Sequence, residues 1–243
     1  MRIIYITKAR LPTEKAYGTN MVKTCEALAK MGAEVILIAP KCGNKNAPHD
    51  IFSYYAIKNI FKVRYLPIID SISLGWPGGF WINHLSFLCA VLFSNLGEKR
   101  KCVILARDEL AALCLKMKGY RVFYDMHGFP EKKRWFWRII MRRMDGIIAT
   151  NWYKIVQCRD VFGISEARMM VAPNGFDPAL FDIKESKEEL RKKLNLPQNA
   201  RVVMYTGNFY DWKGAYTLLD AVRIVQQEFF VFVGGSGKEL EDF

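Results

Sequence analysis

Short apolar runs with the character of β-strands alternate along this chain with segments of helical periodicity. The strand-like runs cover residues 2–7, 34–39, 102–106, 121–126, 146–150, 169–172, 202–206 and 229–233. Several are continuously apolar, as expected of strands that helices cover on both faces of a sheet. The first helical segment, 18–31, has its apolar residues on one face: Met21, Cys25, Leu28 and Ala29. The pattern predicts an α/β fold with a mainly parallel sheet and helices on both of its faces.

Two features mark a boundary in the last third of the chain. Residues 173–178, PNGFDP, are rich in turn-forming residues. A charged helix follows, with Ser186 and Glu189 in capping-box spacing. From Arg201 onward a strand, a helix and a second strand form the opening of a βαβ unit, without the further units of a doubly wound sheet. We therefore expect a first domain at 1–180, a connector at 181–199 and an incomplete second domain at 200–243.

The composition is globular but strongly basic, with 36 Lys and Arg against 24 Asp and Glu and a net charge of +12. This balance favours anionic partners, namely phosphorylated small molecules, nucleic acid or an anionic membrane, and it equally fits a solvated basic surface. No RNP motif, helix-turn-helix or zinc finger supports nucleic acid. The six cysteines form no CxxC pair and do not cluster with the three histidines, which argues against a metal site and favours the reducing cytoplasm.

Two segments bear on membrane contact. The longest apolar stretch, 80–96, contains polar residues that include Asn83, His84, Ser86 and Ser94, whereas a spanning helix needs about 20 predominantly apolar ones. We expect it to be a core or interfacial helix. The segment from Lys132 to Arg143 has a basic stripe of Arg134, Arg138 and Arg142, opposite an apolar arc: Trp135, Phe136, Ile139 and Ile140. It is typical both of a helix lying on an anionic membrane and of a sheet-covering helix with solvated arginines.

The loop between the first strand and the first helix is long and polar. It lacks the G-x-G-x-x-G fingerprint, which argues against an NAD-dependent dehydrogenase. With the start of the helix it supplies polar side chains at the edge where open α/β sheets bind ligands: Lys8, Arg10, Lys15, Tyr17, Thr19 and Asn20. Gly18 would let the chain turn tightly into the helix. The alternative interpretation is an ordinary surface loop.

Two further strand ends carry candidate chemistry. Asp125 lies at the end of the strand at 121–126, and His127 follows that strand. The carboxylate could orient or charge the histidine if the extended conformation persists through His127. A histidine with a purely structural role is the alternative. Residues 207–214, GNFYDWKG, join a strand to a helix. Gly207 permits close backbone approach there, and Lys213 can meet a phosphate at the start of the helix.

Taken in order, these segments resemble the retaining glycosyltransferases of family 4, which have the GT-B fold of two facing Rossmann-like domains. The resemblance rests on the first loop with Pro12 and Lys15-Ala16-Tyr17-Gly18, on Asp125-Met126-His127, on APNGFD at 172–177 with Phe181, and on Tyr205-Thr206-Gly207 with Lys213-Gly214. It implies transfer of a sugar from a nucleotide-sugar, which is a substrate, to a glycan, lipid or other acceptor of the cell envelope. It implies retention of configuration and no metal or other cofactor.

The resemblance also implies roles for particular residues. His127 matches a catalytic histidine near the reacting sugar. The acceptor-side residues would be Tyr17, Gly18, Asn20, Asp125 and Asn174. The donor-binding residues would be Gly207, Asn208, Lys213 and Gly214, with Lys213 holding the diphosphate.

The chain departs from the family pattern at three points. Asn208 stands where arginine is frequent, and Asp125 where glutamate is common. By the family pattern, the acidic E-x7-E segment that contacts the donor would lie beyond Phe243. The alternative hypothesis is therefore a truncated, non-catalytic module that binds an acceptor, a membrane or a partner subunit.

Overall fold

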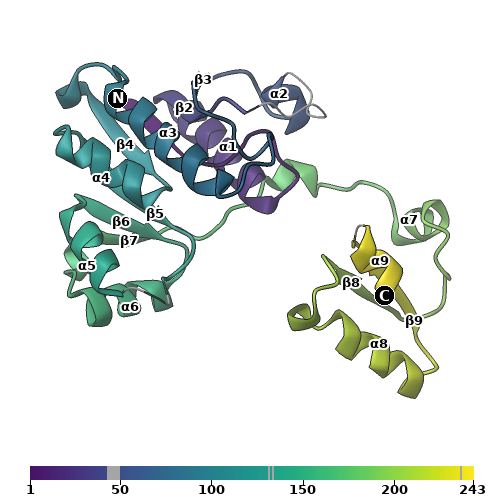
Figure 1. Ribbon diagram of the computed structural model, residues 1–243. Helices are drawn as coiled ribbons and strands as arrows, with labels where there is room; N and C mark the ends of the chain where they lie inside the picture. Colours follow the sequence, from purple (N-terminus) through teal and green to yellow (C-terminus); the bar gives the residue numbers. More distant parts are fainter. Residues whose placement is uncertain (43–49, 131, 133, 236) are drawn as a thin grey trace. The chain divides into compact units, whose positions relative to one another are not determined.

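The computed structural model describes residues 1–42, 50–130, 132, 134–235 and 237–243 (Figure 1). The chain divides into two compact units, Met1–Gly175 and Phe176–Phe243. The functional division at 1–180, 181–199 and 200–243 stays a prediction.

A seven-stranded parallel sheet forms the centre of the first unit, in the order β3-β2-β1-β4-β5-β6-β7. Its strands are β1 (Arg2–Ile6), β2 (Glu34–Pro40), β3 (Lys62–Leu66), β4 (Cys102–Ala106), β5 (Arg121–Met126), β6 (Gly146–Ala149) and β7 (Met169–Val171). The predicted α/β fold class is confirmed. Strand β3 was not predicted, because this edge strand exposes the charged residues Lys62 and Arg64 and so lacks an apolar run.

Helices cover both faces of this sheet. The elements are α1 (Ala16–Lys30), α2 (Ile51–Tyr54), α3 (Gly79–Phe93), α4 (Glu109–Met117), α5 (Arg134–Arg143) and α6 (Trp152–Phe162). Alternate side chains of β1 point to opposite faces. Ile4 and Ile6 belong to the core formed with α3 to α6, whereas Ile3 and Tyr5 belong to the core formed with α1 and α2. The continuous apolar run in β1 is thus explained by burial on both sides.

The second unit begins with short elements and contains the predicted βαβ opening. Its elements are α7 (Lys187–Lys193), β8 (Val202–Thr206), α8 (Ala215–Ile224), β9 (Phe229–Val233) and α9 (Lys238–Asp242). Strands β8 and β9 pair in parallel. The capping box of Ser186 and Glu189 at α7 is confirmed, since each side chain bonds the other residue's backbone N–H. Short 3-10 turns lie at Lys99–Lys101, Glu166–Arg168, Pro178–Leu180 and Asp211–Lys213.

Within the described ranges, no helix combines the length and the apolar content needed to cross a bilayer.

Candidate functional site

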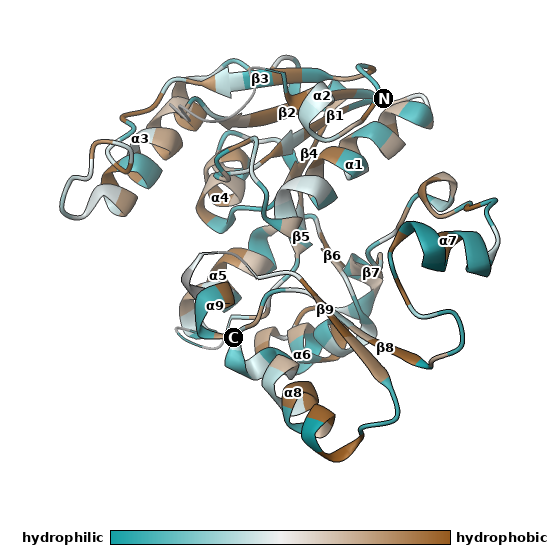
Figure 2. Cartoon of the chain, turned by 90° about the vertical axis from the view of Figure 1, so that its right-hand side faces the viewer, coloured by the Kyte–Doolittle hydropathy of each residue, from teal (hydrophilic) through white to brown (hydrophobic). Residues whose placement is uncertain are grey.

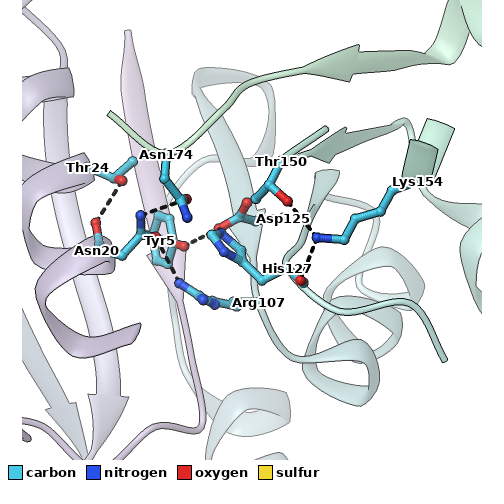
Figure 3. Close-up of polar contacts among 9 residues, drawn as sticks. All are labelled: Tyr5, Asn20, Thr24, Arg107, Asp125, His127, Thr150, Lys154 and Asn174. Carbon is cyan, nitrogen blue, oxygen red and sulfur yellow. Dashed lines mark hydrogen bonds and ion pairs between the residues drawn. The ribbon is translucent and has the colours of Figure 1, made fainter. Parts of the chain in front are cut away.

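Polar side chains from five segments meet at the carboxyl edge of the seven-stranded sheet (Figure 3). All seven strands run in parallel, so the residues that follow each strand emerge at the same edge. The group consists of Tyr5, Asn20, Thr24, Arg107, Asp125, His127, Thr150, Lys154 and Asn174. All nine belong to the first unit.

Asp125 and His127 form a close pair at the end of β5. His127 Nε2 lies 3.0 Å from Asp125 Oδ2, and the same oxygen accepts a hydrogen bond from Tyr5 Oη. Burial works to raise the pKa of Asp125, but the hydrogen bonds from His127 and Tyr5 and the attraction of His127 and Arg107 hold that pKa below its usual value. Burial and the negative charge of Asp125 raise the pKa of Tyr5. Tyr5 therefore stays protonated and donates to an ionised carboxylate.

Asn20 and Asn174 lie side by side although 154 residues separate them in sequence. Asn20 Nδ2 donates to Asn174 Oδ1 at 3.0 Å, and Arg107 Nη1 donates to Asn20 Oδ1 at 3.1 Å. Because the guanidinium only donates, it fixes which end of the Asn20 amide faces Asn174. Thr24 Oγ1 donates to the Asn20 carbonyl oxygen at 2.8 Å. The start of α1 and the chain after β7 thus present two amides beside Arg107.

Lys154 supports the backbone that carries His127. Its Nζ donates to the His127 carbonyl oxygen at 2.7 Å and to Thr150 Oγ1 at 2.5 Å. Asn151 caps α6 by accepting a hydrogen bond from the Lys154 backbone N–H at 3.0 Å. The lysine therefore lies in the first turn of α6, directed at the loop after β5.

The predicted role of Gly18 as a turn residue is wrong. Helix α1 begins two residues earlier, at Ala16, and Gly18 lies in its first turn. A Cβ at Gly18 would lie 2.3 Å from Tyr55 Oη and 2.6 Å from Thr13 Cγ2. Tyr55 Oη bonds both the N–H and the carbonyl oxygen of Thr13, each at 2.8 Å. The missing Cβ thus makes room for the tyrosine that fixes the first loop. Tyr17 is exposed, and among the described residues no hydrogen bond joins it to Asn20.

A second ionic group, beside the first, has a structural character. Asp108 is fully buried and caps α4 by accepting from the Ala111 N–H at 2.8 Å. Its Oδ2 lies 2.8 Å from Lys8 Nζ and 3.1 Å from His84 Nε2. Burial opposes ionisation of Asp108, but the contacts with His84, Lys8 and Ala111 hold its pKa below the usual value. Lys8, predicted as a loop cation, is therefore engaged with a buried carboxylate.

The predicted donor-binding loop lies in the second unit, between β8 and α8. Gly207 has φ 142°, and a Cβ on Gly234 would lie 1.9 Å from its carbonyl oxygen, so the two strand ends approach closely. Asn208 Nδ2 donates to Tyr210 Oη at 3.2 Å. Lys213 ends a 3-10 turn, with Nζ 5.3 Å from the centre of the Trp212 ring. Gly214, with φ 80°, caps α8.

Sequence reasoning missed Tyr5, Arg107, Thr150 and Lys154. Arg107 and Thr150 directly follow apolar β-strands, and this position was the available signal. Tyr5 lies within an apolar run and Lys154 within a helix, where nothing in the sequence pattern marks them. Among the described residues, no three His, Cys, Asp or Glu side chains are arranged to hold a metal. The expectation of a metal-free site stays a prediction.

Comparison with known proteins places most of the first unit in one family. Residues 18–180 match the family profile Glycosyltransferase Family 4, which is more than half of the chain. Comparison with curated protein sequences gives no significant match.

Solved structures share the fold at low sequence identity. A glycosyltransferase from Rickettsia africae ESF-5 superposes with a TM-score of 0.65 and 16% identity, covering 99% of this chain and 62% of its own. HepE from Anabaena, in complex with UDP and glucose, gives 0.68 and 17%, covering 100% of this chain and 63% of its own. A UDP-GlcNAc 2-epimerase from Neisseria meningitidis gives 0.57 and 12%, covering 100% of this chain and 67% of its own.

The structural likeness shows the GT-B fold, which carries more than one kind of sugar-nucleotide chemistry. The chain spans 62–63% of the length of the Rickettsia and Anabaena proteins. The family match is independent of that likeness and includes Asn20, Asp125, His127 and Asn174. On this evidence the chain belongs to glycosyltransferase family 4.

Proposed function

We propose that the protein transfers a sugar from a nucleotide-sugar to an acceptor hydroxyl, with retention of configuration. In this reaction the bond from the anomeric carbon to the nucleotide diphosphate breaks, and a bond to the acceptor oxygen forms on the same face of the sugar. The acceptor proton passes to the departing diphosphate. The family match and the complexes of Anabaena HepE with UDP-glucose and with UDP and glucose support a nucleotide-sugar donor.

The pairing of His127 with Asp125 is the observation that carries this proposal. A carboxylate that accepts from His127 fixes the imidazole at the edge of the sheet where α/β folds bind ligands. Lys154 holds the His127 carbonyl from the other side. A histidine held at two points is suited to contact a reacting sugar in a fixed geometry. We assign His127 as the catalytic residue.

We assign donor binding to Gly207, Asn208, Lys213 and Gly214 in the second unit. The lysine is a compact cation next to a glycine that caps a helix, which suits a diphosphate. Its charge would stabilise the leaving group, so no separate cofactor is part of the proposal.

On the acceptor side we assign Tyr17, Gly18, Asn20, Asp125 and Asn174. Asn20 and Asn174 offer amides for sugar hydroxyls, whereas Gly18 acts through the shape of the first loop. We propose a cell-envelope glycan or glycolipid as the product, made in the cytoplasm at the inner face of the membrane.

The proposal includes contact of the segment from Lys132 to Arg143 with an anionic membrane. In the structure, the residues of the predicted apolar arc differ in burial. Ile140 is buried in the core, whereas Trp135 is 69% exposed and Ile139 is also exposed. The exposed pair lies among arginines of α5, a combination that favours an interfacial position.

The test is sugar transfer by the purified protein, supplied with a panel of nucleotide-sugars and lipid and glycan extracts of the envelope. Mass spectrometry identifies the product, and anomeric coupling constants in proton NMR report the configuration. We expect His127→Ala and Lys213→Ala to reduce transfer by about a hundredfold or more, while Lys192→Ala, an exposed lysine of α7, leaves it unchanged. Unchanged rates in the first two variants would refute the assignments, and an inverted product would refute retention.

The alternative function is a non-catalytic module that binds an acceptor, a membrane or a partner subunit. Its motivation is that the chain spans 62–63% of the Rickettsia and Anabaena structures. Acceptor binding without transfer from any donor of the panel supports this alternative. Robust transfer by the 243-residue protein contradicts it.

A further inference from the structure

The outward side of helix α3 is apolar. Phe87 and Val91 face the core and are fully buried. On the outer face, Trp81 and Leu85 are 63% and 58% exposed, and Leu92 continues the same stripe. Figure 2 shows apolar colouring over much of α3, whereas α7 of the second unit is hydrophilic. A helix whose outward side is apolar is normally covered by protein or lipid.

The segment before α3 extends this surface. Leu74 and Trp76 are exposed there, as is Phe80 in the first turn of the helix. The segment is held against α3, because Ser71 Oγ donates to the Gly79 carbonyl oxygen at 2.6 Å and Gly79 N–H donates to Trp76 O at 2.9 Å. We call the exposed set the α3 surface: Leu74, Trp76, Phe80, Trp81, Leu85 and Leu92.

Buried polar contacts fix which face of α3 is outward. His84 is buried and meets Asp108, which also pairs with Lys8. Asn83, the residue before His84, is also buried, and its amide donates to Asp70. Rotating α3 to hide its outer stripe would break these contacts and remove one partner of a buried carboxylate. The α3 surface is therefore a fixed feature of the first unit.

The net charge of the first unit favours an anionic partner for the α3 surface. The first unit has 27 Lys and Arg against 13 Asp and Glu, a net charge of +14, whereas the second has 9 against 11, which is −2. At the end of α3, Lys118 Nζ donates to the carbonyl oxygens of Val91, Leu92 and Ser94. An anionic bilayer complements this charge, whereas a second copy would bring two such units together.

We propose that the α3 surface docks onto an anionic lipid bilayer, with α3 lying in the interface. Its 15 residues make it about 22 Å long, shorter than the roughly 30 Å hydrocarbon core, so it lies on the bilayer. Trp76 and Trp81 suit the headgroup level. The surface is distinct from the segment from Lys132 to Arg143, and its test does not depend on sugar transfer.

The experiment is flotation of the full chain with vesicles of phosphatidylcholine alone or with 30 mol% phosphatidylglycerol, an amount set on the order of natural anionic content. The test variant is Trp76→Ser/Trp81→Ser/Leu85→Ser, whose three sites are each at least half exposed, and circular dichroism checks that it keeps the wild-type fold. The matched control is Trp212→Ser, an exposed tryptophan of the second unit. A separate variant, Trp135→Ser/Ile139→Ser, reports the contribution of α5.

We expect the wild type and Trp212→Ser to float with the anionic vesicles, and the triple variant to lose at least about tenfold in partition coefficient. Brominated lipid should quench tryptophan fluorescence less in the triple variant than in Trp135→Ser/Ile139→Ser. Equal binding of the triple variant and the wild type, or no binding of either, overturns the proposal. So does a dimer, seen by sedimentation equilibrium, that the triple variant dissociates without any vesicle binding.

Discussion

The hydroxyl of Tyr5, on β1, donates a hydrogen bond to the carboxylate of Asp125, on β5, across the intervening strand β4. In the sheet register Tyr5 pairs with Leu105, which pairs with Phe123, so Asp125 lies two residues further toward the carboxyl edge. Tyr5 has no exposed surface. A side chain of the buried sheet thus holds the carboxylate that contacts His127.

Replacing Tyr5 with phenylalanine removes one donor from an ionised acid. A hydrogen bond to a charged group contributes about 1.5–3 kcal/mol, so the pKa of Asp125 should rise by about one to two units and stability should fall by a similar energy. Carboxyl carbon NMR titration of Asp125 measures the first effect and urea denaturation the second.

The matched control is Tyr120→Phe. Tyr120 is also buried, but its hydroxyl donates to the Gly97 carbonyl oxygen at 3.1 Å, away from the candidate site. This variant should lose stability without moving the Asp125 titration. If the two variants titrate alike at Asp125, the hydroxyl of Tyr5 does not hold that carboxylate.

Gly18→Ala should destabilise the protein through a steric conflict. The added Cβ meets Tyr55 Oη, which is fixed by two hydrogen bonds to Thr13. Overpacking of this kind costs about 1–3 kcal/mol. Gly175→Ala is the control, since a Cβ there meets nothing within 4 Å. Equal urea midpoints for the two variants would show that the first loop yields to the extra atom.

Lys154→Met should slow sugar transfer with little change in donor KM. Its ammonium bonds the His127 carbonyl oxygen, so its loss lets the loop that carries His127 relax. A tenfold loss in kcat corresponds to a rise of about 1.4 kcal/mol in the activation free energy, caused by the misplaced histidine. Lys116→Met is the control, because Lys116 pairs with Asp145, outside the candidate site. A loss in thermal stability with unchanged kcat would assign Lys154 a structural role only.

Sequence periodicity predicted every strand of the seven-stranded sheet except the edge strand β3. The bounds of β4 and β5 agree with the predicted runs, because both strands are apolar enough to be seen without their neighbours. Strand β3 was missed, since Lys62 and Arg64 face solvent on an edge strand and hide the pattern. An apolar run, whether or not both faces of the strand are buried, is thus the signal that local sequence reveals.

The candidate site was predictable where residues follow strands. Asp125 and His127 were proposed from their position at the end of β5, and the structure brings them into contact. The contact between Asn20 and Asn174 depends on the path of the whole unit, and Tyr5 reaches its partner across another strand. Such pairings are set by topology, which no local pattern contains.

The buried carboxylates make stability depend on acid pH. Asp108 and Asp125 both have pKa values held below the usual aspartate value of about 3.9 in the folded protein. A carboxyl whose folded pKa is lowered binds protons more readily when unfolded. Its stabilising contribution is complete above pH of about 3.9 and is lost as the pH falls through the folded value. Lys8, His84 and Glu109 are the charged or titratable groups around Asp108.

Asp108→Asn should therefore destabilise the protein more at pH 7 than at pH 3. Removing the charge leaves Lys8 beside a buried neutral amide, and the loss should lie below the cost of about 3–5 kcal/mol for a fully buried pair, because the Lys8 side chain is 34% exposed. Urea denaturation of wild type and variant across this pH range measures the difference, which should shrink as the wild-type carboxyl protonates. Asp182→Asn, which removes an exposed ion pair with Lys184, should change stability by less than about 1 kcal/mol at either pH. A constant difference between wild type and Asp108→Asn at all pH values would mean that the ionised form of Asp108 gives no advantage to the fold.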